Sequence, residues 1–230
     1  DMLKIDTHAH YLPRNWPDLA AKYGDIRFPV IHHGDDGRAR IYKDGKFFRE
    51  IWAKTWDPKL RIEEFAGFGV QVQVLSTVPV MFSYWAKPHH AHDLHQALND
   101  HMAEAVREYP RHYAGIGTIP LQSPRLAIQE MERCVDQLGL QGVQIGSHVN
   151  DWNLDAPELF DVFQAASELG AAILVHPWDM MGSESMPKYW LPWLVGLPAL
   201  LLSCRRALQA WARWADPPAR ARVVSVVAQG

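Results

Sequence analysis

The sequence predicts an α/β fold made of parallel strand–helix units, and three observations support this prediction. Short apolar runs rich in β-branched residues recur between residues 3 and 176, a segment with helical periodicity follows each run, and turn residues separate the two. Strands that alternate with helices in this way form either an open doubly wound sheet or a (β/α)8 barrel. Periodicity alone does not choose between them, but no glycine-rich phosphate loop follows the first strand, which disfavours a dinucleotide-binding sheet.

The strands are short and either continuously apolar or alternating, as buried strands of a parallel sheet are. Five segments have this pattern: LKIDTHAH (3–10), VQVQVLST (70–77), HYAGIGTIP (112–120), QGVQIGSHV (141–149) and AAILVHPW (171–178).

The helices between these strands are delimited by capping and stop residues. Asp, Ser or Pro precedes a helical pattern where a helix should begin, and glycine follows where it should end. The predicted helices run from Asp57-Pro58 to Gly67–Gly69, over 90–109, from Ser123-Pro124 to Gly139, and from Asp155 to Gly170.

Residues 26–51 interrupt the strand–helix alternation. This segment contains two Asp-Gly turns flanked by alternating apolar residues, which predicts a small antiparallel meander. It is inserted between the first strand and the helix that begins near Pro58. Because the loops that follow strands surround the active-site mouth of a barrel, we expect this meander to lie over the site.

Composition excludes several classes of protein. The chain has 230 residues, of which 48% are hydrophobic and 21% charged, and its net charge of −3 gives no electrostatic reason to expect nucleic acid or a membrane surface as partner. The two cysteines, Cys134 and Cys204, form no disulfide framework, so we expect a reducing compartment, the cytosol. The apolar stretch 190–204 is short for a membrane span and is interrupted by Pro and Gly, which favours a site wall or a subunit contact. No secretory signal is expected before LKIDTHAH.

Three histidines are candidate metal ligands. His8 and His10 project to the same side at the end of the first strand, and neutral imidazoles paired this way suit Zn²⁺. A bare pair of this kind is more often two hydrogen-bonded polar residues without a metal. His176, at the end of the fifth strand, converges with them if the strands close into a barrel, and three histidines complete a catalytic-type ligand set. Asp6 is predicted to share their face and to orient a ligand.

Other polar and aromatic residues are assigned weaker roles. His148 is interpreted as lining the site or as structural, and the histidines between 89 and 101 as a solvated helix face. On the meander, Arg49 and Lys43 can hold a substrate carboxylate, although exposed cations on a hairpin are an equal alternative. Three tryptophans near the fifth strand can wall an apolar cleft: Trp178, Trp190 and Trp193.

Five segments together resemble a known enzyme family: LKIDTHAHYLPRNWPDL, LSTVPVMFSYWAKP, GVQIGSHVN, LVHPWDM and KYWLPWLVG. They are similar to the α-amino-β-carboxymuconate-ε-semialdehyde decarboxylases, which belong to the amidohydrolase superfamily of metal-dependent (β/α)8 barrels. The resemblance extends from about residue 2 to about residue 198.

The resemblance implies a site and an activity. His8, His10 and His176 match three zinc ligands of the family, Arg49 matches a substrate-carboxylate arginine, and Met180 and Trp193 match residues that line the substrate cleft. The implied reaction is the zinc-dependent, non-oxidative decarboxylation of 2-amino-3-carboxymuconate 6-semialdehyde, a small molecule of the kynurenine branch of tryptophan catabolism, which limits quinolinate and NAD synthesis. A cytosolic homodimer is also implied.

The chain departs from the family pattern after residue 198. The family places a proton-transfer His in an Ala-His-Gly-Gly segment and an Asp ligand in a Gly-Thr-Asp-Tyr-Pro segment, and neither segment occurs here. We therefore predict an incomplete barrel of about five βα units over residues 1–198 and a divergent tail over 199–230, in which VVSVV (223–227) is a strand or a sticky end.

Because both segments are absent, no catalytic residue is assigned, and weak or no activity is expected. Two other interpretations remain open: a metal hydrolase of the same superfamily, and a non-catalytic chain that modulates the full-length enzyme by pairing with it.

Overall fold

The computed structural model describes residues 2–178 and 223–225, and its centre is a set of parallel strands arranged in sequence order. One sheet has the order β1-β5-β6 and another the order β12-β11-β8-β7. Only Ile116 separates β6 from β7, so the two sheets continue one another. The strands are β1 (Ile5–His10), β5 (Val72–Ser76), β6 (Tyr113–Gly115), β7 (Gly117–Thr118), β8 (Gly142–Gly146), β11 (Ala172–His176) and β12 (Val223–Ser225). All five predicted strands are confirmed.

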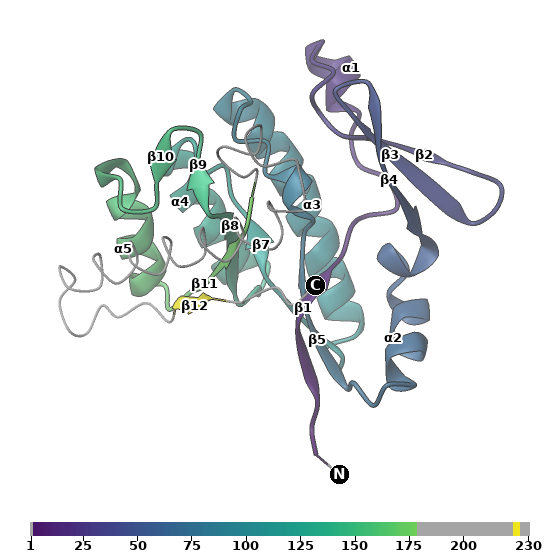
Figure 1. The fold of residues 1–230 in the computed structure, drawn as a ribbon. Coiled ribbons are helices and arrows are strands. Elements are labelled where there is room, and N and C mark those ends of the chain that lie inside the picture. The colour runs from purple at the N-terminus through teal and green to yellow at the C-terminus, as the bar shows by residue number, and fades with distance from the viewer. Residues whose placement is uncertain (1, 179–222, 226–230) are drawn as a thin grey trace, which may run out of the picture.

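Helices connect the parallel strands from β1 to β11, except across the single residue between β6 and β7, as the alternation predicts (Figure 1). The principal helices are α2 (Pro58–Ala66), α3 (Pro88–Glu108), α4 (Pro124–Glu132), which continues as a π-helix over Arg133–Gln137, and α5 (Phe160–Glu168). The short ones are α1 (Leu19–Tyr23) and 3-10 turns over Ala53–Thr55, Pro79–Met81 and Pro157–Leu159.

The predicted helix boundaries are confirmed except at one start. The Asp57 carboxylate accepts hydrogen bonds from the backbone N–H groups of Lys59 and Leu60, which is an N-cap arrangement. Asp155 was expected to cap the fourth helix in the same way, and this is wrong: a 3-10 turn with Ala156 at its N-cap comes first, and α5 begins at Phe160. Pro157 explains the difference, because it begins a tight turn two residues after Asp155.

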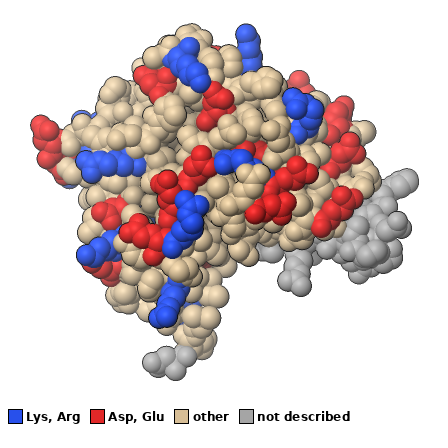
Figure 2. Space-filling model, turned by 180° about the vertical axis from the view of Figure 1, so that it is seen from behind, with Lys and Arg blue, Asp and Glu red and all other residues tan. Residues whose placement is uncertain are grey.

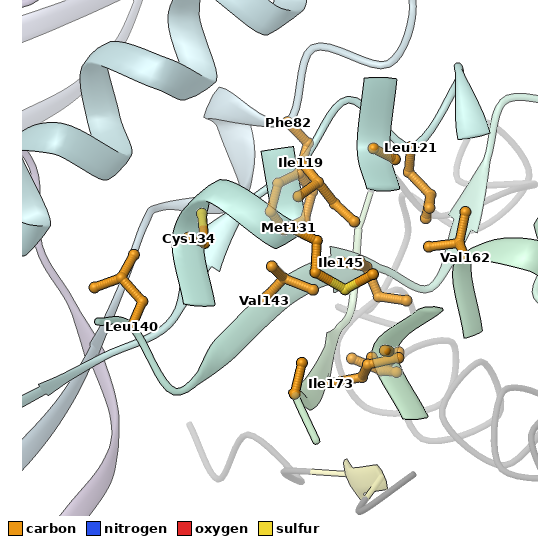
Figure 3. Packing of buried hydrophobic residues seen from close by; sticks show 14 of the residues in the cluster. Phe82, Ile119, Leu121, Met131, Cys134, Leu140, Val143, Ile145, Val162 and Ile173 are labelled. Atoms are coloured by element: carbon orange, nitrogen blue, oxygen red, sulfur yellow. The ribbon is translucent and has the colours of Figure 1, made fainter. Parts of the chain in front are cut away.

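The main hydrophobic core lies between the outer face of the strands and the helices. Val143 and Ile145 of β8 pack with Met131 of α4, and Ile173 and Val162 belong to the same buried cluster (Figure 3). Two glycines allow this close packing. A Cβ atom on Gly115 would lie 2.6 Å from Leu140 Cδ2, and one on Gly117 would lie 2.6 Å from Cys134 Sγ. Burial also raises the pKa of the Cys134 thiol, so it packs as an apolar group.

The predicted antiparallel meander is confirmed. It consists of β2 (Val30–His33), β3 (Arg38–Lys43) and β4 (Lys46–Trp52) in the order β2-β3-β4, and it lies at one end of the molecule beside α1 (Figure 1). Asp44 and Gly45 both have positive φ, 55° and 67°, as the two central residues of a tight hairpin turn require. A second buried cluster, which includes Phe28, Ile41 and Leu94, attaches the meander to α3.

Strand β1 contains a bulge that changes which side chains face inward. Asp6 pairs with Gln73 and Ala9 with Leu75, so three steps along β1 match two along β5. Paired residues of a parallel ladder point to the same face, and Ala9 and Leu75 are buried in the core on the helix side. Asp6 therefore faces outward with Ala9, whereas His8 and His10 face the interior.

Two further features concern the sheet edge and the surface. β12 pairs in parallel with β11, so the strand interpretation of VVSVV is confirmed for Val223–Ser225. A small antiparallel pair, β9 (His148–Val149) and β10 (Trp152–Asn153), follows β8.

On the face drawn in Figure 2, positive and negative side chains are interspersed. Among the described residues, no helix has the length and apolar character needed to cross a bilayer.

The apolar stretch 190–204 and the predicted site residues Met180, Trp190 and Trp193 lie outside the described residues. The predicted boundary at residue 198 lies there too and stays a prediction.

Candidate metal centre

Three histidine side chains meet inside the curved sheet at the carboxyl ends of its strands. Nε2 of His8 lies 3.2 Å from Nε2 of His10 and 3.1 Å from Nε2 of His176. One candidate ligand atom from each residue lies within 4.8 Å of the other two. The predicted convergence of β1 with the fifth strand is confirmed.

Backbone carbonyls fix the tautomer of two of these histidines. Nδ1 of His10 lies 2.9 Å from the carbonyl oxygen of Thr77, and Nδ1 of His176 lies 2.7 Å from that of Pro177. A carbonyl oxygen only accepts, so each Nδ1 carries the proton and donates it. The lone pair of each ring is then on Nε2, and it points into the cluster.

The donor set suits a divalent metal ion. Imidazole nitrogens bound at about 2.1 Å to one tetrahedral Zn²⁺ lie about 3.4 Å apart, which is close to both Nε2 separations here. All three side chains are half-buried, which leaves the cluster open to a further ligand. Three neutral nitrogens with an open side are typical of a catalytic zinc site.

Burial keeps two of the three histidines, His10 and His176, in their ligating protonation state. The pKa of His10 is lowered to about 3, first by burial and then by the neighbouring His176 and His8. Burial also lowers the pKa of His176 to about 4, because it outweighs the hydrogen bond to the Pro177 carbonyl, and the neighbouring His8 contributes in the same direction as burial. At neutral pH both rings are uncharged, so protons do not compete with a metal for these nitrogens.

Asp6 does not orient an imidazole ring, and that prediction is wrong. Its carboxylate accepts from the backbone N–H of His8 at 3.1 Å and from Nε2 of Gln73 at 2.8 Å. The β1 bulge is the reason, because it turns Asp6 to the opposite face from His8. Asp6 thus holds the bulged backbone instead of a metal ligand.

Aromatic residues build the wall beside His176. Gly146 is its register partner on β8, and the Gly146 N–H donates to the Tyr84 hydroxyl at 3.0 Å. A Cβ atom at Gly146 would come within 3.0 Å of Tyr84 and 3.1 Å of Trp178. The Trp178 ring also meets Phe82 edge to face, with centroids 5.6 Å apart.

Sequence reasoning identified Trp178 as part of a wall but missed Phe82 and Tyr84. The available signal was their position directly after the second strand, where side chains at the mouth of a barrel are expected.

The meander brings one of its two predicted cations toward this wall. Nζ of Lys43 lies 5.7 Å from the centre of the Trp178 ring, which supports the expected position of the hairpin tip over the site. Arg49 is exposed on β4, and its guanidinium lies 5.7 Å from the Phe48 ring. Its role at the substrate stays a prediction.

Histidines of α3 differ from expectation. His92 and His95 are buried rather than on a solvated face. Nε2 of His92 lies 3.0 Å from the Glu130 carboxylate, and Nε2 of His95 lies within hydrogen-bond distance of the Met81 and Phe82 carbonyl oxygens. Their partners lie far along the chain, and so the local helical pattern did not indicate burial. His148 is buried in β9 with Nδ1 3.4 Å from the Ser147 hydroxyl, and both of its predicted roles stay open.

Comparison with known proteins identifies the class. A family model described as amidohydrolase matches residues 5–229, so this chain belongs to the amidohydrolase family. Within it, the chain is 54% identical over 197 residues to 2-amino-3-carboxymuconate-6-semialdehyde decarboxylase of Dictyostelium discoideum, covering 86% of this chain and 55% of that protein. It is 32% identical to the protein of the same name from Caenorhabditis elegans, covering 85% of this chain and 61% of that one. The chain thus spans somewhat more than half the length of these curated relatives.

Solved structures agree on the fold. The 5-carboxyvanillate decarboxylase of Sphingomonas paucimobilis matches with a TM-score of 0.73 at 23% identity, covering 98% of this chain and 67% of that one. A dihydroxybenzoic acid decarboxylase from Polaromonas, solved with bound manganese, matches with a TM-score of 0.67 at 18% identity, covering 98% and 64%. At these identities the likeness shows a shared fold.

Proposed function

We propose that this chain is a divalent-metal-dependent decarboxylase of the amidohydrolase family, acting on 2-amino-3-carboxymuconate 6-semialdehyde. The observation that carries the proposal is the His8–His10–His176 cluster, built at the carboxyl ends of the strands in a chain 54% identical to a decarboxylase of that name. The proposal includes zinc as the metal, the kynurenine pathway as the setting and a cytosolic homodimer as the assembly. Family resemblance supports each of these.

The three histidines and Lys43 contribute different parts of the proposed chemistry. His8, His10 and His176 would hold the metal through Nε2, and the carbonyl oxygens of Thr77 and Pro177 keep two of the rings in the ligating tautomer. A bound divalent ion supplies Lewis acidity, which polarises an oxygen group and lowers the pKa of water. The Lys43 ammonium lies near the Trp178 ring, and in this proposal it attracts a carboxylate toward the mouth of the site.

The wall contributes by excluding water. Tyr84 and Trp178 lie against Gly146 beside His176, Phe82 packs on both of these rings, and the Tyr84 hydroxyl accepts from the Gly146 N–H. An apolar wall strengthens electrostatic interactions in the site because fewer water dipoles screen them.

We further propose an incomplete barrel of about five βα units, with activity well below that of the longer relatives. Support comes from the absence of the Ala-His-Gly-Gly and Gly-Thr-Asp-Tyr-Pro segments from the 230 residues. The proton-transfer His and the Asp ligand of the family have no counterpart in this sequence.

The test is carbon dioxide release from enzymatically generated substrate by zinc-loaded protein, with metal content measured on the same sample. We expect one zinc per chain and slow, zinc-dependent release of carbon dioxide. His176→Ala should lose both, whereas His33→Ala, an exposed histidine of the meander, should retain both. Formation of a hydrolysed acid without carbon dioxide would assign the chain to the metal hydrolases instead. A folded chain without zinc would contradict the proposal.

A further inference from the structure

Three buried polar side chains on the strands have no hydrogen-bond partner among the described residues. They are Ser76 of β5, Thr118 of β7 and Gln144 of β8, each 0% exposed. The two hydroxyl oxygens are unpaired, and so are both the oxygen and the nitrogen of the Gln144 amide. Buried polar groups in proteins are nearly always paired, so such a cluster calls for a ligand.

The pairing of the strands places all three on the inner face of the sheet. Val143 and Ile145 pack outward into the core, so Gln144 between them points inward. A Cβ on Gly117 would point at Cys134 on the helix side, so Thr118 points the other way. Ser76 is the register partner of His10 and shares its face.

The same pairing puts the cluster beside the three histidines. Thr118 pairs with Gln144, and Gln144 pairs with Leu174. His176 is two residues beyond Leu174 on the same face, a distance of about 6.6 Å along the strand. Ser76 lies on β5, the neighbour of β1, and Gln144 lies on β8, the neighbour of β11. These two side chains therefore lie on either side of the metal centre, and Thr118 of β7 lies between them.

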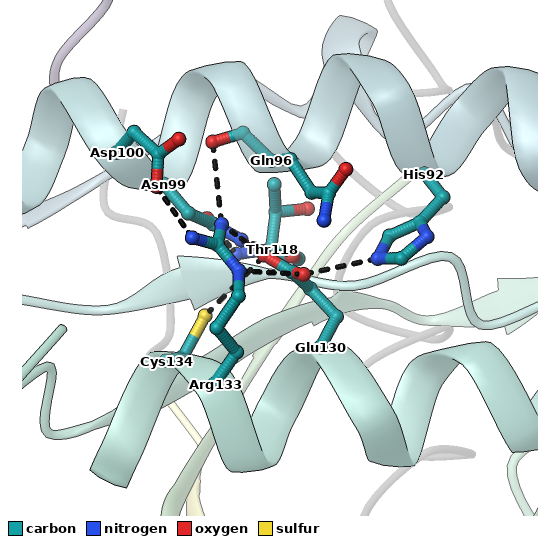
Figure 4. Close-up of polar contacts among 8 residues, drawn as sticks. All are labelled: His92, Gln96, Asn99, Asp100, Thr118, Glu130, Arg133 and Cys134. Carbon is teal, nitrogen blue, oxygen red and sulfur yellow. Dashed lines mark hydrogen bonds and ion pairs between the residues drawn. The ribbon is translucent and has the colours of Figure 1, made fainter. Parts of the chain in front are cut away.

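Thr118 is held in place from outside the sheet (Figure 4). The Asn99 side chain accepts from its N–H at 2.8 Å and donates to its carbonyl oxygen at 2.9 Å. Asn99 also donates to the buried Glu130 carboxylate at 2.7 Å, and Arg133 donates to Glu130 at 2.8 Å. The backbone of Thr118 is fully satisfied and rigidly placed, while its hydroxyl is left available on the inner face.

We propose that Gln144, Thr118 and Ser76 form a hydrogen-bonding subsite for a neutral oxygen group, supplied either by water or by the hydroxyl or carbonyl of an organic ligand. All three side chains are uncharged and offer both donors and acceptors, which suits a neutral group better than a carboxylate. The inference rests on the metal centre of the proposed function, because the subsite lies beside its ligands. It does not depend on which reaction follows.

The test compares two glutamines of similar burial on opposite faces. Gln144→Leu removes the unpaired amide. Gln73→Leu is the matched control, since Gln73 is 3% exposed and its amide is paired with Arg61 at 2.9 Å and Asp6 at 2.8 Å. Thermal unfolding of the metal-free protein and the Zn²⁺ dissociation constant, from chelator competition, are measured for each.

Gln144→Leu should raise the Tm of the metal-free protein by about 2–4 °C, because an unpaired buried amide is replaced by an apolar side chain. It should weaken Zn²⁺ binding about tenfold, as the loss of groups around metal ligands does. Gln73→Leu should lower the Tm and leave the Zn²⁺ affinity within about twofold, because its amide lies on the other face. Thr118→Val, which keeps the Asn99 bonds to the backbone, should follow Gln144→Leu in both measurements.

The probes separate the two sources of the oxygen group. Weaker binding of Zn²⁺ alone assigns the subsite to water. Unchanged Zn²⁺ affinity with weaker binding of 2,6-dihydroxybenzoate to the zinc-loaded variant assigns it to an organic hydroxyl. If neither affinity changes in Gln144→Leu and Thr118→Val, or if Gln144→Leu lowers the Tm as the control does, the proposal is overturned. If the subsite proposal is overturned but the protein still releases carbon dioxide in a zinc-dependent reaction, the proposed function is supported without the subsite.

Discussion

Replacing Glu130 by Ala should destabilise the protein more than any surface substitution, because Glu130 joins α4 to α3 and, through Asn99, to Thr118 of β7. Its carboxylate is 1% exposed and accepts from Asn99 at 2.7 Å, from Arg133 at 2.8 and 3.0 Å, and lies 3.0 Å from Nε2 of His92 (Figure 4). Removing one member of a buried ion pair destabilises by about 3–5 kcal/mol, since the other charge is left uncompensated.

Two features of the site place the expected loss at the lower end of that range. Arg133 is 19% exposed at its side chain and keeps its ion pair with Asp100, and Asn99 keeps its bond to the Thr118 carbonyl. We therefore expect a loss of about 3 kcal/mol in unfolding free energy. For a chain of this size, that corresponds to a Tm lower by about 6–12 °C.

Urea and thermal unfolding, followed by circular dichroism, measure both quantities. Glu132→Ala is the matched control, because Glu132 is exposed on the same helix two residues further on, and it should change the free energy by less than about 0.5 kcal/mol. Glu130→Gln keeps an acceptor oxygen and should lose about 1–2 kcal/mol. A Glu130→Ala variant as stable as Glu132→Ala would refute the reasoning.

The remaining predictions concern the metal centre and the core. The metal-free protein should lose stability as pH falls from about 6.5 toward 4. In the unfolded chain His10 and His176 take up protons near the ordinary histidine pKa, whereas their folded pKa values of about 3 and about 4 keep them unprotonated in the native state. Urea midpoints at several pH values measure this loss, and a midpoint that does not change with pH would contradict it. Zn²⁺ at about 100 times its dissociation constant should stabilise the protein by about 2.7 kcal/mol, and His10→Ala should abolish the gain in a thermal shift assay. Gly117→Ala should destabilise by about 1–3 kcal/mol, because its Cβ would lie 2.6 Å from Cys134 Sγ, and a Tm equal to that of the unsubstituted protein would show that the core relaxes around it.

Most elements could be predicted from the sequence because their signals are local. Asp57 caps α2 through the backbone of residues in the next turn, and the Asp44-Gly45 turn fixes the hairpin between β3 and β4. The two histidines of β1 were predicted for the same reason, since residues two apart in a strand share a face. The predictions were wrong where the orientation or burial of a side chain depends on a partner far away in the sequence.

Asp6 shows why periodicity alone was insufficient. A strict alternation puts Asp6 on the face of His8, but the β1 bulge inserts a residue between them, and a bulge is a property of the pairing with β5. The burial of His92 has a similar origin, because its partner Glu130 lies 38 residues further along the chain. The unpaired Gln144 amide was also invisible to sequence, since its face depends on how β8 lies between β7 and β11.

Formation of the metal centre therefore depends on the arrangement of the sheet as a whole. His8 and His176 are 168 residues apart in the sequence, yet their Nε2 atoms lie 3.1 Å from one another. Only the curvature accumulated through β5, β6, β7 and β8 brings the ends of β1 and β11 together. An unfolded chain offers no such set of ligands, so the free energy of metal binding stabilises the folded sheet.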